Sequence, residues 1–347
     1  MPDKNRSLAV LERYVAGLPR VALGLFPTPL VRLDRLSEDL SVDLWMKREE
    51  CSGLALGGNK TRKLEFVLAD ALEKGHDTIV TTGPVTSNHT MMTAAAARRL
   101  GLAIHCVVGG TRPPDVSGNL LLLDYMGARL HFSPLDFANP DPAEVRALAR
   151  LQREVVEATG GYWIPAGGTM PEAEPGFMSA VAEIARQRGG RVDFDHLVVA
   201  LGTGSTTTGL LLGLALGGFR DTTLDAVAVN TRHALEEVFE RPPAADLFAH
   251  SSRELGLDLD VRELPVHELV YGFGEEGYGV PSQAGDHAIR CLLEREGYVL
   301  DPVYTAKAFA GLLAMREDGR IARGSRVLFL HTGGLSMTPS AEKRFRG

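Results

Sequence analysis

The sequence predicts an α/β fold in about two domains. Short apolar runs alternate along the chain with segments of helical periodicity, which is typical of a parallel sheet covered by helices on both faces. The length of 347 residues corresponds to about two domains of ordinary size, each able to bury its own core. Glycine occurs 38 times, well above an average usage of about 7%, without a collagen period or a low-complexity run. This excess predicts many tight loops.

Five apolar runs predict strands that are buried on both faces. Each of them ends at a glycine or a polar turn, as expected for the strands of a parallel sheet. In chain order they are Asp77–Thr82, Ala103–Val108, His196–Leu201, Leu224–Asn230 and Arg326–His331.

Helical patterns fill the intervals between these runs. In the segment Arg62–Glu73, the apolar residues at 64, 67, 68 and 72 fall on one helical face. Further helices are predicted at Ser87–Leu100, Asn119–Met126, Ala143–Ala158 and Ala284–Glu296. Prolines and glycine pairs between positions 140 and 168 predict a domain boundary near the end of that stretch.

Composition excludes several classes of protein. The net charge of −7, with both signs mixed, argues against a nucleic-acid binder. Three widely spaced cysteines form neither a disulfide framework nor a zinc motif. The N-terminus lacks the apolar core of a signal peptide, and glycine, serine and threonine interrupt the most apolar stretch, His196–Phe219. We therefore expect a soluble, cytoplasmic protein.

The first glycine-rich segment, Leu56–Lys63, places two glycines ahead of Lys60 and of a helix start near Thr61. A helix N-terminus beside cationic side chains is a natural anion site, and glycines let the backbone approach a ligand closely. Lys60 is therefore a candidate phosphate partner or Schiff-base nucleophile. An ordinary surface lysine is the alternative.

The second segment, Gly202–Gly209, reads GTGSTTTG and follows the predicted strand His196–Leu201 directly. Strand, glycine loop and helix start together predict a phosphate cradle of backbone N–H groups and hydroxyls. The spacing matches neither a Walker loop nor a dinucleotide fingerprint. A tight turn without a ligand is the alternative, although packing alone explains four consecutive hydroxyl side chains poorly.

Two further groups of residues have a structural and a functional interpretation. The segment GPVTSNH also follows a strand and opens a helix, so Ser87 is either an N-cap or, with Asn88 and His89, part of a carboxylate pocket. Tyr278 and Tyr304 stand beside glycine or proline turns, where they either pack or flank a ring-shaped ligand.

Together these segments resemble the fold-type II family of pyridoxal-phosphate (PLP) enzymes, the tryptophan-synthase β-like group. Within it, the chain is most similar to the branch that contains D-cysteine desulfhydrase, 1-aminocyclopropane-1-carboxylate (ACC) deaminase and L-cysteate sulfo-lyase. The matching blocks run in the family's order over almost the whole chain: PTPL at 27–30, GGNKTRKLE at 57–65, SNH at 87–89, GNLLLLDYMGA at 118–128, GTGSTTTG at 202–209, GYGVP at 277–281, DPVYT at 301–305 and HTGG at 331–334.

The resemblance implies two domains, each an open, twisted, mostly parallel sheet flanked by helices, with PLP in the cleft between them. Residues 1–56 and 169–347 would form the larger, PLP-binding domain, and residues 57–168 a smaller inserted domain. The cofactor would be pyridoxal 5'-phosphate and the substrate a small amino acid. The family also implies a homodimer. From the composition, we expect no nucleic acid, membrane or metal ion among the partners.

The resemblance assigns the catalytic roles to Lys60, Ser87, Tyr278 and Tyr304. Lys60 would carry PLP through its amine and, once released, act as base or acid at the substrate Cα. The two tyrosines would flank the cofactor ring and the substrate.

Binding roles follow from the same blocks. Ser87 and His89, with Asn88 and Tyr278, would meet the substrate, through its carboxylate or in proton transfer, and Asn88 would bond the ring hydroxyl. The remaining cofactor contacts would come from the phosphate loop, from a second lysine and from two threonines near the pyridine nitrogen: Gly202, Thr203, Gly204, Ser205, Thr206, Thr207, Lys63, Thr305 and Thr332.

Thr305 and Thr332 favour one reaction over another. Deaminases of this branch carry glutamate after the tyrosine of the DPVY motif and an apolar residue before the last glycine pair. A neutral hydroxyl does not stabilise a protonated ring nitrogen as a carboxylate does. We therefore expect α,β-elimination from a small amino acid with a β-leaving group, D-cysteine or a relative, to give pyruvate, ammonia and the leaving group.

Several positions depart from the family pattern near the substrate side of its pocket. Thr86 replaces a glutamine, Met91 and Met92 replace an Arg-Gln pair, and Gly168–Glu172 and Leu335–Met337 differ from the usual loops. The alternatives are therefore an ACC deaminase, an L-cysteate sulfo-lyase, a biosynthetic β-replacement enzyme, or a PLP-binding protein without lyase turnover.

Overall fold

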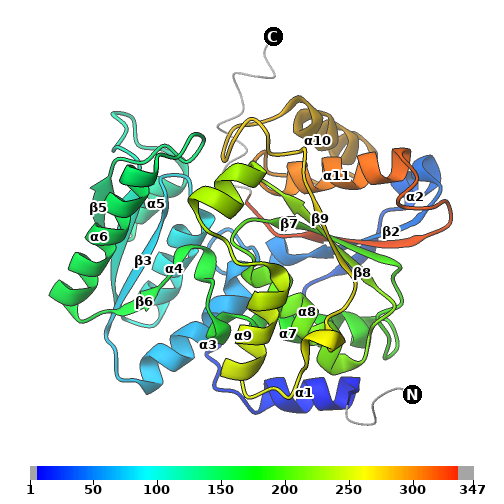
Figure 1. Ribbon diagram of the computed structural model, residues 1–347, viewed down its shortest axis with the longest axis horizontal. Coiled ribbons are helices and arrows are strands. Elements are labelled where there is room, and N and C mark those ends of the chain that lie inside the picture. Colours follow the sequence, from blue (N-terminus) through cyan, green and yellow to red (C-terminus); the bar gives the residue numbers. More distant parts are fainter. Residues whose placement is uncertain (1–5, 335–347) are drawn as a thin grey trace.

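The computed structural model describes residues 6–334, which fold around two separate sheets (Figure 1). We call the part built on the six-stranded sheet the larger domain and the part built on the four-stranded sheet the smaller domain. The divergent segment Leu335–Met337 lies outside the described residues. None of the helices in the described range is long and apolar enough to cross a membrane.

The larger sheet unites strands from both ends of the chain. Its order is β1-β2-β10-β7-β8-β9, and every neighbouring pair is parallel except β1 with β2. Val327 of β10 lies opposite Leu44 on one side and His196 on the other, so the last strand is inserted between the earliest strands and the middle of the chain. The strands are β1 (Leu30–Arg32), β2 (Asp43–Arg48), β7 (His196–Leu201), β8 (Thr223–Ala228), β9 (His267–Val270) and β10 (Arg326–His331).

The smaller sheet is parallel throughout and has the order β5-β4-β3-β6. Its first strand in the chain, β3, is central and pairs with β4 on one side and β6 on the other. The strands are β3 (Thr78–Pro84), β4 (Ala103–Gly109), β5 (Arg129–Ser133) and β6 (Tyr162–Ile164).

Helices cover both faces of each sheet and form four clusters of buried side chains. In the larger domain, α1, α7, α8 and α9 pack on one face and α2, α10 and α11 on the other; in the smaller domain, α3, α4 and α5 lie opposite α6 (Figure 1). The bounds are α1 (Leu8–Ala16), α2 (Asp34–Leu40), α3 (Lys60–Glu73), α4 (Asn88–Arg99), α5 (Gly118–Tyr125), α6 (Pro142–Thr159), α7 (Pro175–Gln187), α8 (Ser205–Gly217), α9 (Ala244–Glu254), α10 (Gln283–Glu296) and α11 (Thr305–Glu317).

The predicted α/β class with two mostly parallel sheets is confirmed. The runs at 196–201 and 326–331 form strands with the predicted bounds, and the other three predicted strands shift by one or two residues. The strand β2 escaped prediction because its sequence DLWMKR looks polar, although Lys47 is fully buried against Glu183. The domain boundaries at residues 57 and 169 stay a prediction.

A buried ion network joins the start of α3 to the larger domain. The Arg62 guanidinium is 1% exposed and donates to Glu49 and to Glu183, and its plane lies over the ring of Phe26 at 4.3 Å. Lys47 pairs with Glu183 from the other side. Because each buried charge has an opposite partner, the network fixes the direction of α3 at its first turn.

Helices α3 and α7 approach each other most closely at Gly176. A Cβ atom at this position would lie 2.6 Å from the carbonyl carbon and oxygen of Arg62. We expect Gly176→Ala to lower the free energy of unfolding by about 1–3 kcal/mol, because such a clash forces the two helices apart. Urea or guanidinium denaturation measures this change.

Gly17→Ala is the matched control. Gly17 has φ −81° and its nearest non-neighbouring atom would be 3.4 Å from an added Cβ, so it accepts alanine without a shift of the backbone. If Gly176→Ala were no less stable than this control, the proposed helix contact would be wrong.

Candidate active site

A cavity of about 420 Å³ lies between the two domains, at the carboxyl ends of strands from both sheets. The end of β3 and the start of α4 line it from the smaller domain, and the ends of β7 and β8 line it from the larger domain. The first turn of α3 contributes Lys60 and Lys63. Parallel α/β sheets bind ligands at this edge because loops and helix N-termini converge there.

Two lysines one helical turn apart enter this cavity. Lys60 is the first residue of α3, and burial lowers the pKa of its amine to about 8. Burial and the charge of Lys60 lower the pKa of Lys63 well below its usual value. The Lys63 Nζ donates to the carbonyl oxygen of Gly167 at 3.1 Å. An anion placed beside this pair would restore the charge of both amines.

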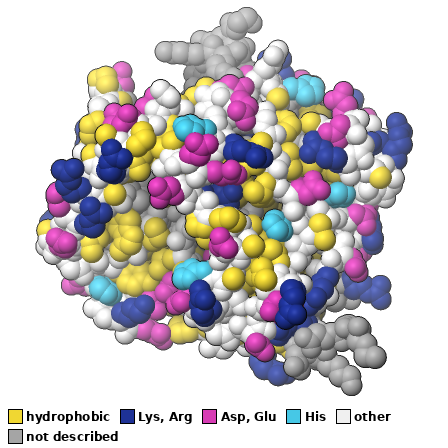
Figure 2. All heavy atoms as spheres, in the orientation of Figure 1, with side chains coloured by type: hydrophobic (Ala, Val, Ile, Leu, Met, Phe, Trp, Pro, Cys, Tyr) yellow, Lys and Arg dark blue, Asp and Glu magenta, His cyan; other side chains and the backbone are white. Residues whose placement is uncertain are grey.

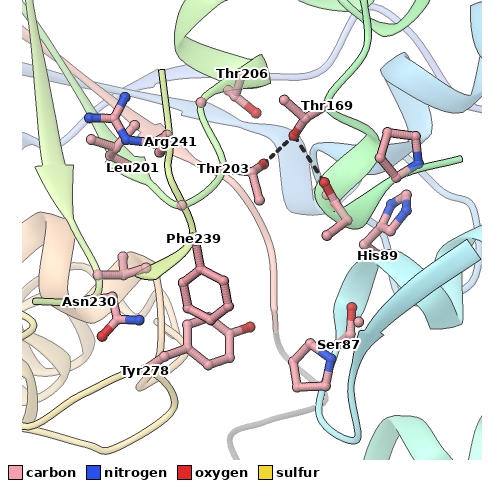
Figure 3. Close-up of a pocket in the computed structure, with 18 of the residues that line it drawn as sticks. Ser87, His89, Thr169, Leu201, Thr203, Thr206, Asn230, Phe239, Arg241 and Tyr278 are labelled. Atoms are coloured by element: carbon pink, nitrogen blue, oxygen red, sulfur yellow. Dashed lines mark hydrogen bonds between the residues drawn. The ribbon is translucent and has the colours of Figure 1, made fainter. Parts of the chain in front are cut away.

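The loop before α8 presents backbone N–H groups to the cavity. Gly204 occupies the N-cap with φ 107°, a left-handed conformation, and no side chain caps the helix. Its first-turn amides therefore point toward the cavity wall formed by Thr206 and Thr207, where the helix dipole favours an anion. Thr203 and Thr206 also have partners from outside the loop: Thr169 Oγ1 donates to Thr203 Oγ1 at 2.6 Å (Figure 3), and Asn59 Nδ2 donates to Thr206 Oγ1 at 3.1 Å.

The N-terminus of α4 lies across the cavity from this loop. Ser87 accepts from the N–H of Thr90 at 3.2 Å and so caps the helix, while it also lines the cavity. Asn119 donates to Asn88 Oδ1 at 2.8 Å and to the carbonyl of Thr86 at 2.9 Å. Both sequence interpretations of Ser87 are therefore compatible, and Asn119 sets the orientation of the Asn88 amide.

The hydrogen bonds around His89 identify its tautomer. Thr81 Oγ1 donates its single proton to the carbonyl of Ile164 at 2.9 Å, so we assign the 2.9 Å contact with His89 to an N–H donated by Nε2. Burial and the charges of Lys60 and Lys63 lower the pKa of His89 well below its usual value. Its Nδ1 is buried and has no hydrogen-bond partner within the described chain. The carbonyl of Pro165 near the ring favours the protonated form, but burial and the two lysines outweigh it.

Tyr278 and Tyr304 form a pair on the larger-domain side. Their hydroxyls hydrogen-bond to each other, and the rings meet edge to face at 5.9 Å and 73°. Burial raises the pKa of Tyr278 to about 12 and raises that of Tyr304 well above its usual value, so both phenols keep their protons at neutral pH. The buried Lys307 fixes the loop by donating to the carbonyls of Gly277 and Val229.

Most predicted site residues line this one cavity, with two exceptions among the described residues. Those that line it are Lys60, Lys63, Ser87, Asn88, His89, Gly202, Thr203, Gly204, Thr206, Thr207, Tyr278, Tyr304 and Thr332. Ser205 and Thr305 do not. Ser205 is turned into the protein, and the Thr305 hydroxyl donates to Asp301 Oδ1 at 2.7 Å inside the first turn of α11. Of the two threonines expected near a ring nitrogen, Thr332 is thus the one that faces the cavity.

Three of the departures from the family pattern also lie outside the cavity wall. Met91 and Met92 are buried in the core of the smaller domain, and Met92 Sδ lies 3.4 Å from where a Cβ of Gly58 would be. Thr86 contributes its carbonyl to Asn119 rather than a side chain to the cavity. These substitutions therefore alter the support of the site and not its lining.

Sequence reasoning missed several lining residues. Asn59 carried a signal, because it immediately precedes the candidate lysine in a motif block. Phe137, Phe239 and Arg241 line the cavity from two separate segments without a local motif, whereas Thr169 belongs to the divergent loop Gly168–Glu172. Within residues 6–334, no cluster of three or more His, Cys, Asp or Glu side chains could hold a metal ion.

Comparison with known proteins places this geometry in context. Residues 21–333 match the family described as pyridoxal-phosphate dependent enzyme. A putative 1-aminocyclopropane-1-carboxylate deaminase of Pyrococcus abyssi is 37% identical over 335 residues, covering 94% of each chain. A D-cysteine desulfhydrase of Yersinia enterocolitica is 39% identical over 334 residues, covering 93% of this chain and 96% of the relative.

Solved structures agree with these relatives. The crystal structure of an ACC deaminase homologue superposes with a TM-score of 0.81 at 36% identity, covering 97% of this chain and 98% of the other. Threonine deaminase isoform 2 from Solanum lycopersicum, at 17% identity and a TM-score of 0.68 over 99% of this chain and 96% of its own, shares the fold.

The lowered pKa of Lys60 has a direct consequence for its reactivity. Since its amine loses its proton near pH 8, we expect Lys60 of the cofactor-free protein to react with acetic anhydride at a lower pH than an exposed lysine does. Competitive labelling followed by peptide mass spectrometry measures both. Lys74 is the control, because its hydrogen bond with Asp70 raises its pKa. Parallel titration of the two lysines would contradict the assignment.

The assigned tautomer of His89 can be observed directly. Nitrogen-15 NMR of labelled imidazoles should show Nε2 protonated and Nδ1 bare, with a titration midpoint well below the usual histidine value because the surroundings oppose a positive charge. A protonated Nδ1, or a midpoint near the usual histidine value, would show that the hydrogen bonding around Thr81 is wrongly assigned.

Proposed function

Because this chain belongs to the pyridoxal-phosphate-dependent enzyme family, we propose that it catalyses the α,β-elimination of a small amino acid with a β-leaving group, D-cysteine or a relative. The products would be pyruvate, ammonia and the leaving group. One observation carries the proposal: a lysine whose pKa is lowered to about 8 shares a single cavity with an anion-binding helix N-terminus and a pair of protonated tyrosines.

The residues present fit the cofactor. Lys60 would bind it through its amine, and the N-terminus of α8 with Lys63 would bind its phosphate, because no side chain caps this helix and burial outweighs the attraction between Lys63 and Glu174. Asn88 and Thr332 would meet the ring substituents. When bound, PLP supplies an electron sink that stabilises negative charge at the substrate Cα.

Lys60 is suited to move the Cα proton. An amine with a pKa near 8 has a useful neutral fraction at neutral pH and still accepts a proton readily, which is the balance that a general base needs. The first turn of α4, with Ser87 at its N-cap, would bind the substrate carboxylate through the helix dipole.

The tyrosine pair is suited to the leaving group. Both phenols keep their protons at neutral pH, so either can donate to a departing anion and share the charge through the hydroxyl–hydroxyl contact. The carboxyl group of Asp301 lies behind Tyr304, where it accepts from the backbone N–H groups at the start of α11 and from Thr305. It therefore supports the tyrosine without entering the cavity.

ACC deaminase is the second candidate, because relatives with that description are as similar to this chain as the desulfhydrases are. The cavity argues for elimination. Thr332 offers a neutral hydroxyl, and no Asp or Glu side chain lines the cavity among the described residues. Ring opening of a cyclopropane requires a stronger electron sink than a neutral neighbour of the ring nitrogen provides.

We also propose that the enzyme works as a homodimer in the cytoplasm. Leu25 and Leu56 are 70% and 46% exposed on the loops that precede α3, an apolar surface suited to a second copy. Its three cysteines are free thiols, which suits a reducing compartment. Light scattering at micromolar concentration would test the dimer.

Reconstitution with PLP tests the proposed function. The holoenzyme should show a visible absorbance band and release pyruvate with sulfide from one enantiomer of cysteine. Lys60→Ala should abolish the absorbance band of lysine-bound PLP. It should also lower kcat by at least about 100-fold, because the proton-transfer group is gone. Lys74→Ala is the control, since Lys74 is exposed, forms its ion pair with Asp70 and does not line the cavity.

The substrate panel decides between the candidates. Oxo acid from 1-aminocyclopropane-1-carboxylate but from neither cysteine enantiomer would establish the deaminase instead. An unchanged spectrum and unchanged turnover after Lys60→Ala would show that Lys60 is not the cofactor lysine.

A further inference from the structure

One wall of the cavity is hydrocarbon that none of the steps above uses. It consists of Val145, Leu148 and Ala149 from α6 in the smaller domain and Leu235 and Phe239 from the larger domain. We call this wall, together with Phe137, the apolar chamber. On the face seen in Figure 2, hydrophobic side chains gather in a hollowed area on the left, the side where Figure 1 shows α6.

The α6 side of the chamber has the spacing of a single helical face. Val145, Leu148 and Ala149 stand at positions i, i+3 and i+4, so their side chains project together from the helix into the cavity. Gln152 follows one turn later, but its Nε2 donates to Thr82 Oγ1 at 3.0 Å. Since the Gln152 amide already donates to a partner in the protein, this wall does not need a polar ligand group to satisfy it.

Aromatic rings close the chamber across the domain boundary. Phe137 from the smaller domain stacks on Phe239 from the larger domain with ring centres 5.9 Å apart and planes at 18°. Phe137 also meets Tyr278 at 5.9 Å and 53°. The chamber is therefore continuous with the tyrosine pair assigned to the leaving group.

The backbone secures this contact between domains. A Cβ at Gly277, which has φ 98°, would lie 2.6 Å from the carbonyl oxygen of Ala138. The loop that carries Tyr278 thus lies directly against the segment that carries Phe137. Because the two backbone segments are in contact, the packing of the domains fixes the positions of the Phe137 and Tyr278 rings.

We propose, on the basis of the elimination function above, that the substrates carry an apolar β-substituent, an alkyl or aryl thioether, which the chamber binds. A sulfide ion leaving from cysteine would bury no hydrocarbon there. Each additional methylene on the sulfur would improve binding by about fourfold when fully buried. Aryl groups would bind more tightly still, because they can contact the rings of Phe137 and Phe239.

The reaction balances without an oxidant or a further reactant besides water. Lys60 takes the Cα proton, the C–H electron pair forms the Cα–Cβ double bond, and the Cβ–S bond breaks with its pair on sulfur. The thiolate takes a proton from the tyrosine pair. Hydrolysis of the aminoacrylate then gives pyruvate and ammonium, so that one thioether amino acid and one water yield pyruvate, ammonium and a thiol.

Arg241 forms a polar edge of the same cavity. Its Nη1 donates to the carbonyl of Pro242 at 3.2 Å, while its buried Nε has no hydrogen-bond partner within the described chain. An anionic substituent, such as the sulfonate of cysteate, would be drawn to this edge and not to the hydrocarbon wall. The substrate panel therefore includes cysteate.

The test compares cysteine, S-methylcysteine, S-benzylcysteine and cysteate, each in both enantiomers, with the PLP-loaded enzyme. We expect kcat/KM to be at least about tenfold higher for S-benzylcysteine than for cysteine, mainly through a lower KM, as for other hydrocarbon groups in apolar pockets. A higher kcat/KM for cysteine or cysteate would overturn the inference. So would competitive inhibition by S-benzylcysteine without release of the thiol.

A substitution that fills the apolar chamber provides a second test of the inference. Ala149→Phe should lower the ratio of kcat/KM for S-benzylcysteine over that for cysteine by about tenfold or more, because the added ring occupies the chamber. Ala143→Phe adds the same ring to an exposed position of α6 outside the cavity and should leave both values unchanged. An unchanged ratio in Ala149→Phe would overturn the inference.

The two proposals fail in different ways. If none of the amino acids, cysteine included, yields an oxo acid, the elimination function is wrong. If cysteine is cleaved faster than the thioethers, only the assignment of the chamber is wrong.

Discussion

The buried guanidinium of Arg62 is the interaction on which the site depends most. It bridges Glu49 and Glu183 of the larger domain, while Lys60 and Lys63 stand on either side of it in the first turn of α3. Removal of one partner from such a network leaves an uncompensated buried charge, at a cost of about 3–5 kcal/mol. The position of the candidate catalytic lysine is therefore set by an ion network outside the cavity, and the close contact at Gly176 fixes the same turn from α7.

The electrostatics of the cavity follow from that placement. Two amines share a low-dielectric space with the N-termini of α4 and α8, and the acidic groups near them keep their protons, so they do not cancel this positive field. Both tyrosines keep their protons, and burial raises the pKa of the Glu174 carboxyl beside Lys63 to about 8. Although the chain has a net charge of −7, this one cleft attracts anions. Such a cleft suits the binding of a phosphate and of an amino-acid carboxylate.

The glycine-rich motifs were informative because backbone chemistry is local. A glycine N-cap after a buried strand predicts an open helix N-terminus wherever it occurs, and the loop before α8 has that form. Single side chains were harder to place. Thr305 and Ser205 belong to motifs that approach the cavity, yet one position along a helix start turns a side chain by about 100°. Thr305 therefore bonds Asp301, and Ser205 is buried away from the cavity.

The amino-acid sequence by itself determined the α/β class and pointed to the candidate lysine and the candidate phosphate loop, because each depends on neighbouring residues along one segment. Only the tertiary structure showed which residues form the apolar chamber beside them. Phe137, the α6 face from Val145 and the segment ending at Phe239 are separated by many residues and share no periodicity that marks a cavity. They meet because two sheets pack with their carboxyl edges facing each other, and the shape between two domains is a property of their packing.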